Sequence, residues 1–413
     1  MEQSVQESNA GLRERRGFVL SSLSLGHGIS HLFSQGFPLL LTEISAAMGF
    51  SNLQNASVFA VRQVGSGFIN LGGGPLVDMF KYHWGLILTG CMLFHGITFA
   101  LMGATPNYAF LVVVSLLFTV PGSLWHLPAA AAISQRFPDR RGFAVTLHGF
   151  GANVGNVFGP IMTGGILGLI TWRPTFFIYA APYFVATLLV WWALKGLGHS
   201  GGDGGPPKTM GAQFRESFGL LRKPLIAGLA IAAMLRTIGL SAVTNWTPFY
   251  LKEPLSEGGL AMGNLEAGFF LTVLTAVGIL STPILGELSD RYGRKNVMLP
   301  GFIAAAVLSM LVVTAGESSR WMLGLVLAAM GIFAYSLHQI LQASVLDVVG
   351  RGTEAKAIGL LFGFSGLLGI ATPFIASAII DNYGGYGSIF YYAGILTAAT
   401  ALMVAILPLK RTP

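Results

Sequence analysis

The polar side chains inside long apolar stretches are the residues of this sequence that could do chemistry. His27, His31 and Gln35 follow one another at intervals of four residues, so a helix places them on one face. A later apolar stretch repeats this spacing with Thr237, Ser241 and Asn245. Amides and hydroxyls bind a polar ligand through hydrogen bonds, and an imidazole exchanges protons near neutral pH. The two stripes therefore predict a shared aqueous cavity.

Arg236 adjoins the second stripe, near the middle of its apolar stretch. A lone arginine at mid-membrane costs about 2.5–3.5 kcal/mol on insertion scales, so it requires a partner. No acidic residue lies deep within an apolar stretch, and we therefore expect Arg236 to hold a negatively charged substrate. Arg62 is a second candidate, which would otherwise extend outward or pair with Glu43.

Further histidines and aromatic residues complete the candidate site. The predicted substrate-binding residues are Arg236, His31, Gln35, Asn245, His126, His338, Trp246 and Arg62. The candidate proton carriers are His27, His31, His126 and His338, because an unperturbed histidine pKa near 6.5 lies within reach of physiological pH. A buried histidine can equally be a hydrogen-bonded packing residue. We expect no metal site and no cofactor.

Twelve apolar stretches, each about 20 residues long, must position these side chains. A bilayer core about 30 Å thick requires roughly 20 apolar residues to cross as a helix, and helices or closed barrels alone satisfy the backbone in lipid. The 413 residues are 53% hydrophobic and 10% charged. The sequence predicts an all-α polytopic membrane protein with 12 transmembrane helices, at residues 18–41, 56–78, 84–104, 108–134, 142–167, 172–195, 224–251, 264–286, 297–316, 320–346, 356–380 and 386–408.

The distribution of Lys and Arg predicts the orientation. Of the 24 basic residues, 19 fall on the segments that share a side with both termini, and only Arg173, Lys252 and Arg320 fall on the opposite side. Under the positive-inside rule both termini are cytoplasmic. The net charge of +7 follows from this topology, so we expect no nucleic-acid partner. The polar N-terminus lacks a small-residue cleavage site, so we expect the first helix to be retained.

The two halves of the chain repeat each other. His126 corresponds to His338 at an offset of 212 residues, and Pro38 corresponds to Pro248 at an offset of 210. A glycine-rich linker separates the halves. We expect two pseudo-symmetric six-helix bundles with the substrate between them near the midplane. The predicted segments are a tail at 1–16, a bundle at 17–195, a linker at 196–223, a bundle at 224–408 and a tail at 409–413.

One loop motif resembles the signature of a known protein family. Residues 286–295 read Gly-Glu-Leu-Ser-Asp-Arg-Tyr-Gly-Arg-Lys, which resembles the loop signature of the major facilitator superfamily. The equivalent first-half loop keeps Gly74, Leu76 and Asp78 but lacks the arginine. Residues 123–128 and the glycine-rich stretch that follows are also similar to exporters of the fosmidomycin-resistance type. The resemblance implies a gating role, by bridging to the other half, for Asp78, Asp290, Arg291, Arg294 and Arg141. The alternative interpretation is that these residues have no gating role and only follow the positive-inside distribution that sets the topology.

The predicted function is secondary transport of a small organic anion, such as a carboxylate or phosphonate, by alternating access. Coupling is by anion exchange or by protons, and we leave the direction open. The first alternative is proton-driven efflux of neutral or amphipathic compounds, and a second is a membrane sensor that does not transport. We expect no enzymatic activity, because no paired carboxylate, Cys–His set or Gly-x-Ser-x-Gly elbow occurs. The expected partners are the substrate and the bilayer of a bacterial-type inner membrane, with the chain acting as a monomer.

Overall fold

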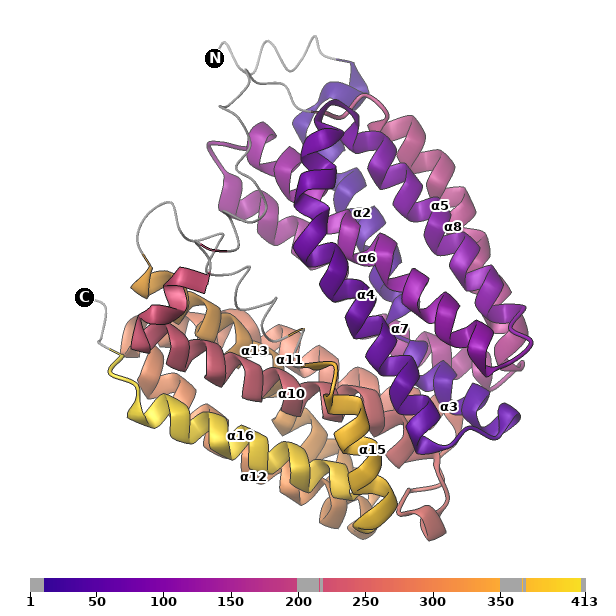
Figure 1. Cartoon of the computed structure of the whole chain (residues 1–413), viewed down its shortest axis with the longest axis vertical. Helices are drawn as coiled ribbons and strands as arrows, with labels where there is room; N and C mark the ends of the chain where they lie inside the picture. The colour runs from indigo at the N-terminus through magenta and orange to yellow at the C-terminus, as the bar shows by residue number, and fades with distance from the viewer. Residues whose placement is uncertain (1–10, 199–214, 216–217, 350–365, 367–368, 410–413) are drawn as a thin grey trace.

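Two bundles of long helices form the molecule (Figure 1). The structure is a computed structural model that describes residues 11–198, 215, 218–349, 366 and 369–409. The described part is helical, with short connections and no β-strand. The N-terminal bundle contains α2 (Arg16–Ser34), α3 (Phe37–Met48), α4 (Asn52–Met79), α5 (Trp84–Gly103), α6 (Tyr108–Arg136), α7 (Arg141–Leu167) and α8 (Trp172–Leu194). The C-terminal bundle contains α10 (Pro224–Lys252), α11 (Asn264–Tyr292), α12 (Arg294–Ser318), α13 (Arg320–Val348), α15 (Thr372–Asn382) and α16 (Ser388–Ile406). Short 3-10 turns lie at Leu12–Glu14, Lys81–His83, Leu220–Arg222 and Leu255–Glu257.

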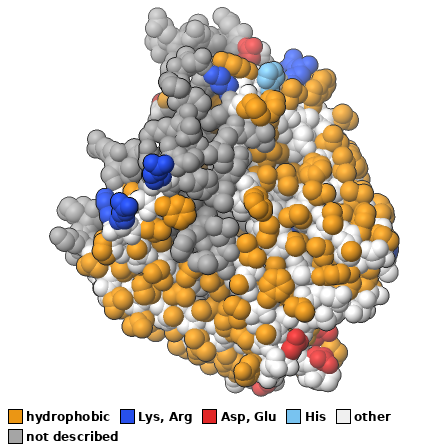
Figure 2. Space-filling view, in the orientation of Figure 1, with side chains coloured by type: hydrophobic (Ala, Val, Ile, Leu, Met, Phe, Trp, Pro, Cys, Tyr) orange, Lys and Arg blue, Asp and Glu red, His pale blue; other side chains and the backbone are white. Residues whose placement is uncertain are grey.

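Eight of the described helices are long and apolar enough to cross a membrane by themselves. They are α5 together with the 3-10 turn that precedes it (Lys81–Gly103), α6, α8, α10, α11, α12, α13 and α16. The more polar helices α2, α4 and α7 carry histidine, glutamine, asparagine and glycine. Hydrophobic side chains cover most of the surface in Figure 2, whereas Lys and Arg gather near the chain termini and most visible Asp and Glu lie at the opposite end. A lipid-facing belt between two polar ends explains this distribution.

The predicted helices agree with the structure except at two places. The predicted span 18–41 is two helices, because α2 ends at Ser34 and α3 begins at Phe37. Pro38, near the start of α3, has no N–H to donate and its ring clashes with the carbonyl four residues earlier, so a continuous helix is interrupted here. Of the predicted span 356–380, residues 356–365 and 367–368 lie outside the described residues, and α15 begins at Thr372.

Glycine allows α2 and α7 to pack at very short distance. A Cβ atom added to Gly155 would lie 2.4 Å from the Gly28 carbonyl oxygen, and one added to Gly151 would lie 2.1 Å from the Ser24 carbonyl oxygen. A larger side chain at either position would force the helices apart. This contact brings the polar faces of α2 and α7 together, as small residues do between membrane helices.

Several polar contacts join the two bundles at one end of the molecule. We call the end where α2 begins and α16 ends the terminal side, and the opposite end the distal side. At the distal side Lys252 pairs with Glu43. Asn52 donates to Asp381 at 2.7 Å and accepts from the Tyr386 hydroxyl at 2.7 Å. These contacts hold α3 and α4 of one bundle against α10, α15 and the α15–α16 loop of the other.

Candidate functional site

A cavity of about 190 Å³ lies between the two bundles. Many of its lining residues occupy equivalent positions in the two halves, 210 or 212 residues apart. These pairs are Ser34 and Thr244, Gln35 and Asn245, Pro38 and Pro248, Phe59 and Leu271, and Arg62 and Leu274. The remaining lining residues are Phe37, Leu39, Pro160, Thr275 and Tyr335. The cavity therefore lies on the approximate two-fold axis that relates the bundles, and we call it the central cavity.

Arg62 is the one charged residue that lines the central cavity within the described part of the chain. Its guanidinium carbon lies 3.9 Å from the ring centroid of Phe37 and 4.6 Å from that of Phe118. The Nη1 atom is buried and has no hydrogen-bond partner. Aromatic faces stabilise a cation by about 0.5–2 kcal/mol but leave its charge in place. The guanidinium of Arg62 therefore keeps its positive charge at the wall of the central cavity.

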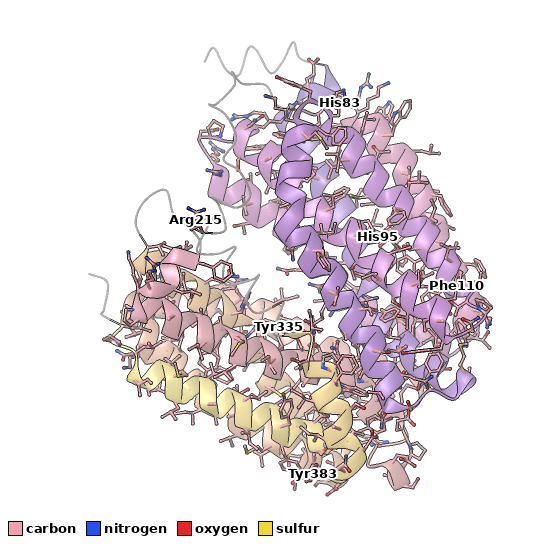
Figure 3. The ribbon with its side chains drawn as sticks, viewed as in Figure 1. His83, His95, Phe110, Arg215, Tyr335 and Tyr383 are labelled. Atoms are coloured by element: carbon pink, nitrogen blue, oxygen red, sulfur yellow. The ribbon has the colours of Figure 1, made fainter. Side chains whose placement is uncertain are left out.

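The interrupted first span supplies one wall of this cavity. Gln35 lies at the end of α2 and Phe37 at the start of α3, and both side chains line the cavity. Interrupted helices mark the binding sites of many transporters, because the break turns polar groups toward the centre of the membrane. Tyr335 of α13 lines the cavity from the C-terminal bundle, and Figure 3 shows it at the inner edge of that bundle.

Arg236 does not line the central cavity. It lies inside the C-terminal bundle, beside a smaller cavity of about 40 Å³ whose other lining residues are mostly apolar. The Nη2 atom donates a hydrogen bond to the carbonyl oxygen of Ala334, the residue that precedes Tyr335. Within the part of the chain that the structure describes, the guanidinium contacts no carboxylate and does not line the central cavity.

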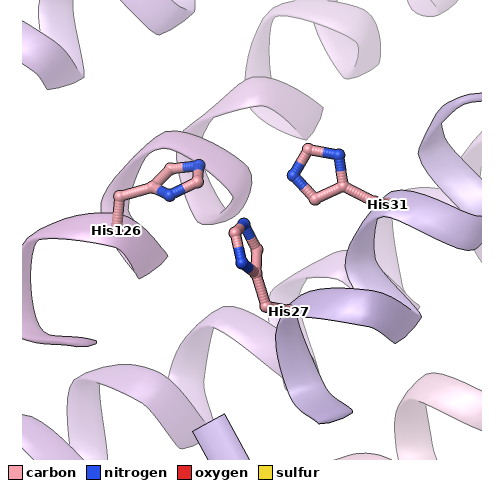
Figure 4. A group of neighbouring side chains, drawn as sticks. All are labelled: His27, His31 and His126. Carbon is pink, nitrogen blue, oxygen red and sulfur yellow. The ribbon is translucent and has the colours of Figure 1, made fainter. Parts of the chain in front are cut away.

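Three of the predicted histidines meet in the N-terminal bundle (Figure 4). We call His27, His31 and His126 the histidine cluster, and one ring nitrogen from each lies within 4.8 Å of the others. The ring centroids of His27 and His31 are 4.7 Å apart, and those of His27 and His126 are 4.8 Å apart. His148 of α7 stacks on His27 with a centroid distance of 4.3 Å. His27 is buried, and His126 is exposed.

The other predicted substrate-binding residues lie elsewhere. His338, the repeat partner of His126, contacts Gln342 on the same helix, with 2.8 Å between their side-chain nitrogens. Trp246 is buried and packs against Phe59 and Phe249, with centroid distances of 5.7 Å and 5.3 Å. The structure thus brings Gln35, Asn245 and Arg62 to one cavity and His27, His31 and His126 to a separate cluster, whereas Arg236, His338 and Trp246 belong to neither group.

The contacts described for the predicted gating residues lie within single bundles. Arg294 pairs with Asp290 on α11 and, at 3.0 Å, with Asp347 on α13. The guanidinium of Arg141 donates to the Ser134 hydroxyl, and that of Arg291 lies 5.4 Å from the ring centroid of Tyr292. The side chain of Asp78 lies outside the described residues. Bridging to the other half therefore stays a prediction for these residues.

A loop on the terminal side of the N-terminal bundle carries a further ion pair. Arg16 at the start of α2 contacts Asp139 at 2.6 Å, and its Nε donates to the Arg136 carbonyl. The hydrogen bond from Arg16 lowers the pKa of the exposed Asp139 carboxyl. This loop is thereby tied to the first helix of its own bundle.

Several residues that line the central cavity or contact Arg62 were not predicted from the sequence. Phe37 and Phe118 flank Arg62, and Thr275 and Tyr335 line the opposite wall. The repeat offset contained a usable signal for some of the lining, since Leu274 is the position equivalent to Arg62. Nothing in the sequence distinguishes Phe118 from the other phenylalanines of its stretch.

Comparison with known proteins establishes the family. The sequence profile described as Major Facilitator Superfamily matches residues 23–264 and 254–413. The chain belongs to this superfamily. It is therefore an integral membrane secondary transporter and not an enzyme.

Relatives and solved structures agree with this assignment. The chain is 27% identical over 340 residues to the MFS transporter asaE of Aspergillus flavus, covering 80% of this chain and 72% of that protein. It is 25% identical over 395 residues to the multidrug resistance protein MdtG of Escherichia fergusonii, covering 92% of each chain. The fold is similar to that of a mutant form of the nucleoside transporter NupG, with a TM-score of 0.79, 15% identity and coverage of 94% of this chain and 100% of that one. A bacterial homologue of the human lysosomal transporter Spinster, solved in an inward-facing and unoccupied conformation, gives a TM-score of 0.69 at 18% identity, with 96% of each chain covered.

Proposed function

We propose that this transporter moves a small organic anion of the carboxylate or phosphonate class by alternating access. Arg62 holds the negative group in the central cavity, and Gln35 and Asn245 form hydrogen bonds to the rest of the molecule. One observation carries the proposal: the half-buried Arg62 lines the cavity on the symmetry axis, and its buried Nη1 atom lacks a hydrogen-bond partner. A buried and unpaired charge is destabilising, so an anionic ligand gains from pairing with it.

The charge of the cavity lining and the volume of the cavity both favour a small anion. No carboxylate lines the cavity within the described residues, so nothing there competes for the guanidinium. A volume of about 190 Å³ holds a compact solute rather than a large amphipathic drug. The polar side chains of Ser34, Thr244 and Thr275 supply further donors and acceptors.

The orientation of the molecule also belongs to this proposal. The excess of Lys and Arg on the segments at the terminal side supports a cytoplasmic location for that side, in a bacterial-type inner membrane. The distal contacts through Glu43 and Asn52 then close the cavity toward the outside. Rearrangement of these contacts as the bundles rock would expose the cavity on the other side. We propose that the chain performs this cycle as a monomer.

Replacement of Arg62 tests the proposal. Purified protein is screened by thermal shift against mono- and dicarboxylates, phosphonates and neutral amphipathic compounds, because a ligand stabilises by RT ln(1 + [L]/Kd). For the anions that stabilise the wild type, Arg62→Gln is expected to weaken binding by about 10- to 150-fold, since a hydrogen bond to a charged group contributes about 1.5–3 kcal/mol. Arg62→Lys keeps the charge without the planar fork and is expected to lose less. Counterflow in proteoliposomes then measures transport of the same compounds.

Arg236→Gln serves as the matched control, because it removes an arginine that does not line the cavity. The proposal requires that this variant keep the anion affinity of the wild type. If anion binding survives Arg62→Gln but is lost in Arg236→Gln, the anion binds at Arg236 in the C-terminal bundle and the proposal is wrong. Stabilisation by neutral amphipathic compounds alone, unchanged in both variants, would reject the anion.

Efflux of drug-like compounds is the second candidate function. The similarity to proteins named multidrug resistance protein MdtG, over 92% of both chains in one case, favours it. In this alternative Arg62 is structural, and its aromatic neighbours Phe37 and Phe118 contribute to binding. The screen described above separates the two functions, because it includes uncharged compounds beside the anions.

A further inference from the structure

We propose that His27, His31 and His126 form a binding site for a divalent transition-metal ion of the zinc type. The three side chains come from α2 and α6, and one nitrogen of each lies within 4.8 Å of the others. In a tetrahedral zinc site with Zn–N bonds of 2.0–2.1 Å, the nitrogens are about 3.3 Å apart. Small side-chain rotations, of about 1.5 Å at the ring nitrogens, bring this cluster to that geometry.

The hydrogen bonds of the cluster leave the required lone pairs free. The Nδ1 atom of His27 lies 3.2 Å from the carbonyl oxygen of His148. A carbonyl oxygen only accepts, so His27 carries its proton on Nδ1 and presents a bare Nε2 atom. That Nε2 atom is buried and has no partner. An imidazole that donates Nδ1–H to a backbone carbonyl and offers Nε2 is the usual arrangement of a metal-ligating histidine.

His31 is oriented in the same way by a side chain. Its Nδ1 atom lies 2.8 Å from Oδ1 of Asn156, an amide oxygen that accepts a hydrogen bond from Nδ1–H. The Nε2 atom of His31 is therefore the acceptor nitrogen that remains. Asn156 does not belong to the three ligands, and it acts as a positioning residue that fixes the ring and its tautomer.

The ligand set indicates which ion fits. Three neutral imidazoles without a carboxylate suit Zn²⁺, Cu²⁺ or Ni²⁺ and not the hard cations Mg²⁺ and Ca²⁺, which prefer oxygen. The cluster supplies three ligand atoms, so a tetrahedral ion bound there would keep a fourth coordination position for another ligand. Three protein ligands with an open fourth position distinguish such a site from a closed structural one.

The metal site is separate from the central cavity, but both include residues from the C-terminal part of α2. None of the three histidines lines the central cavity, whereas Gln35 does, one helical turn beyond His31 on the same face. The ion therefore lies on the terminal side of the anion site. The inference does not depend on the anion, because it rests on the three imidazoles alone.

Zinc titration of the full-length protein tests the site. The protein is purified with an affinity tag that contains no histidine and is stripped with a chelator. Competition with a chromogenic chelator and calorimetry then measure Zn²⁺ binding. We expect one equivalent of Zn²⁺, weakened by about 100-fold or more in His27→Ala, His31→Ala and His126→Gln. Asn156→Ala is expected to weaken binding by about 10–100-fold, because it releases the ring of His31.

His83→Ala is the matched control, since His83 is an exposed histidine outside the cluster. Its Zn²⁺ affinity is expected to equal that of the wild type. His126 is itself exposed, so its replacement leaves the packing intact and keeps the test valid if a variant of buried His27 fails to fold. Titration with Co²⁺ adds a spectroscopic signature, because tetrahedral coordination gives strong visible absorption. Absence of stoichiometric binding, or binding that His126→Gln leaves unchanged, overturns the proposal.

Discussion

In the N-terminal bundle the cavity wall carries Arg62, whereas the equivalent position of the C-terminal bundle is Leu274. The amides Gln35 and Asn245, by contrast, occupy equivalent positions and are both retained. The two halves therefore share the shape of the cavity but not its charge. A duplicated scaffold supplies symmetric hydrogen-bonding groups, and a single substituted position places a positive charge on one side of the cavity only.

The second membrane-embedded arginine shows the opposite substitution. Arg236 corresponds to Gly26, and Leu337, which lines the same small cavity, corresponds to Trp125. In the N-terminal bundle the ring of Trp125 fills the space beside Gly26, where an added Cβ atom would lie 2.6 Å from the ring. In the C-terminal bundle the guanidinium of Arg236 and the smaller Leu337 share this place and leave a cavity of about 40 Å³. Arg236 thus replaces packing volume, while Arg62 adds a charge to the site.

The distal ion pair is the asymmetric contact whose removal should have the largest effect. Glu43 pairs with Lys252, whereas the mirrored pair would join Glu253 to Thr42, which has no charge. Burial raises the pKa of Glu253. We expect Glu43→Gln to shift the population toward distally open states by about tenfold, because it leaves Lys252 half-buried without its partner. Distance distributions between spin labels at exposed Leu53 and Tyr383, with Cys91 replaced, measure this shift.

Glu253→Gln is the control for that experiment, and it is expected to leave the distances unchanged. Equal shifts in both variants would show that the glutamates act through local packing and not through the cross-bundle pair. A shift in Glu253→Gln alone would contradict the arrangement of the distal contacts.

The two retained amides offer a finer comparison of the bundles. If the ligand lies on the symmetry axis, Gln35→Ala and Asn245→Ala should each weaken anion binding by about fivefold, since one hydrogen bond contributes about 1 kcal/mol. To measure the two affinities, each variant is titrated with the anion that gives the largest stabilisation of the wild type. A loss of affinity in Gln35→Ala alone would place the whole ligand against the N-terminal bundle. Unchanged affinity in both variants would show that neither amide binds the ligand.

The helices themselves were predictable because lipid leaves the backbone few options. Long apolar stretches located the spans from Trp84 to Leu194 within a few residues, and the 210-residue offset predicted that Gln35 and Asn245 face one cavity. The break after Ser34 was missed, although Pro38 marks it, since apolar composition continues across the interruption. Depth in a membrane does not say which face a side chain occupies, so sequence alone favoured Arg236 over Arg62. The meeting of His126 with His27 depends on how α2 packs against α6, which no spacing encodes.

The smallest expected effect concerns Arg236. Arg236→Met keeps most of the side-chain volume and removes the donor to the Ala334 carbonyl oxygen. We expect the anion affinity to stay within about twofold of the wild type, because Tyr335 is shifted little when the wall behind it keeps its volume. The free energy of unfolding without ligand is expected to change by no more than about 1 kcal/mol. The substitution loses one hydrogen bond, but it also removes a charge from the interior of the bundle. A loss of binding comparable to that of Arg62→Gln would show that the guanidinium acts on the ligand through Tyr335, and the two bundles would then share the charge as well as the shape of the site.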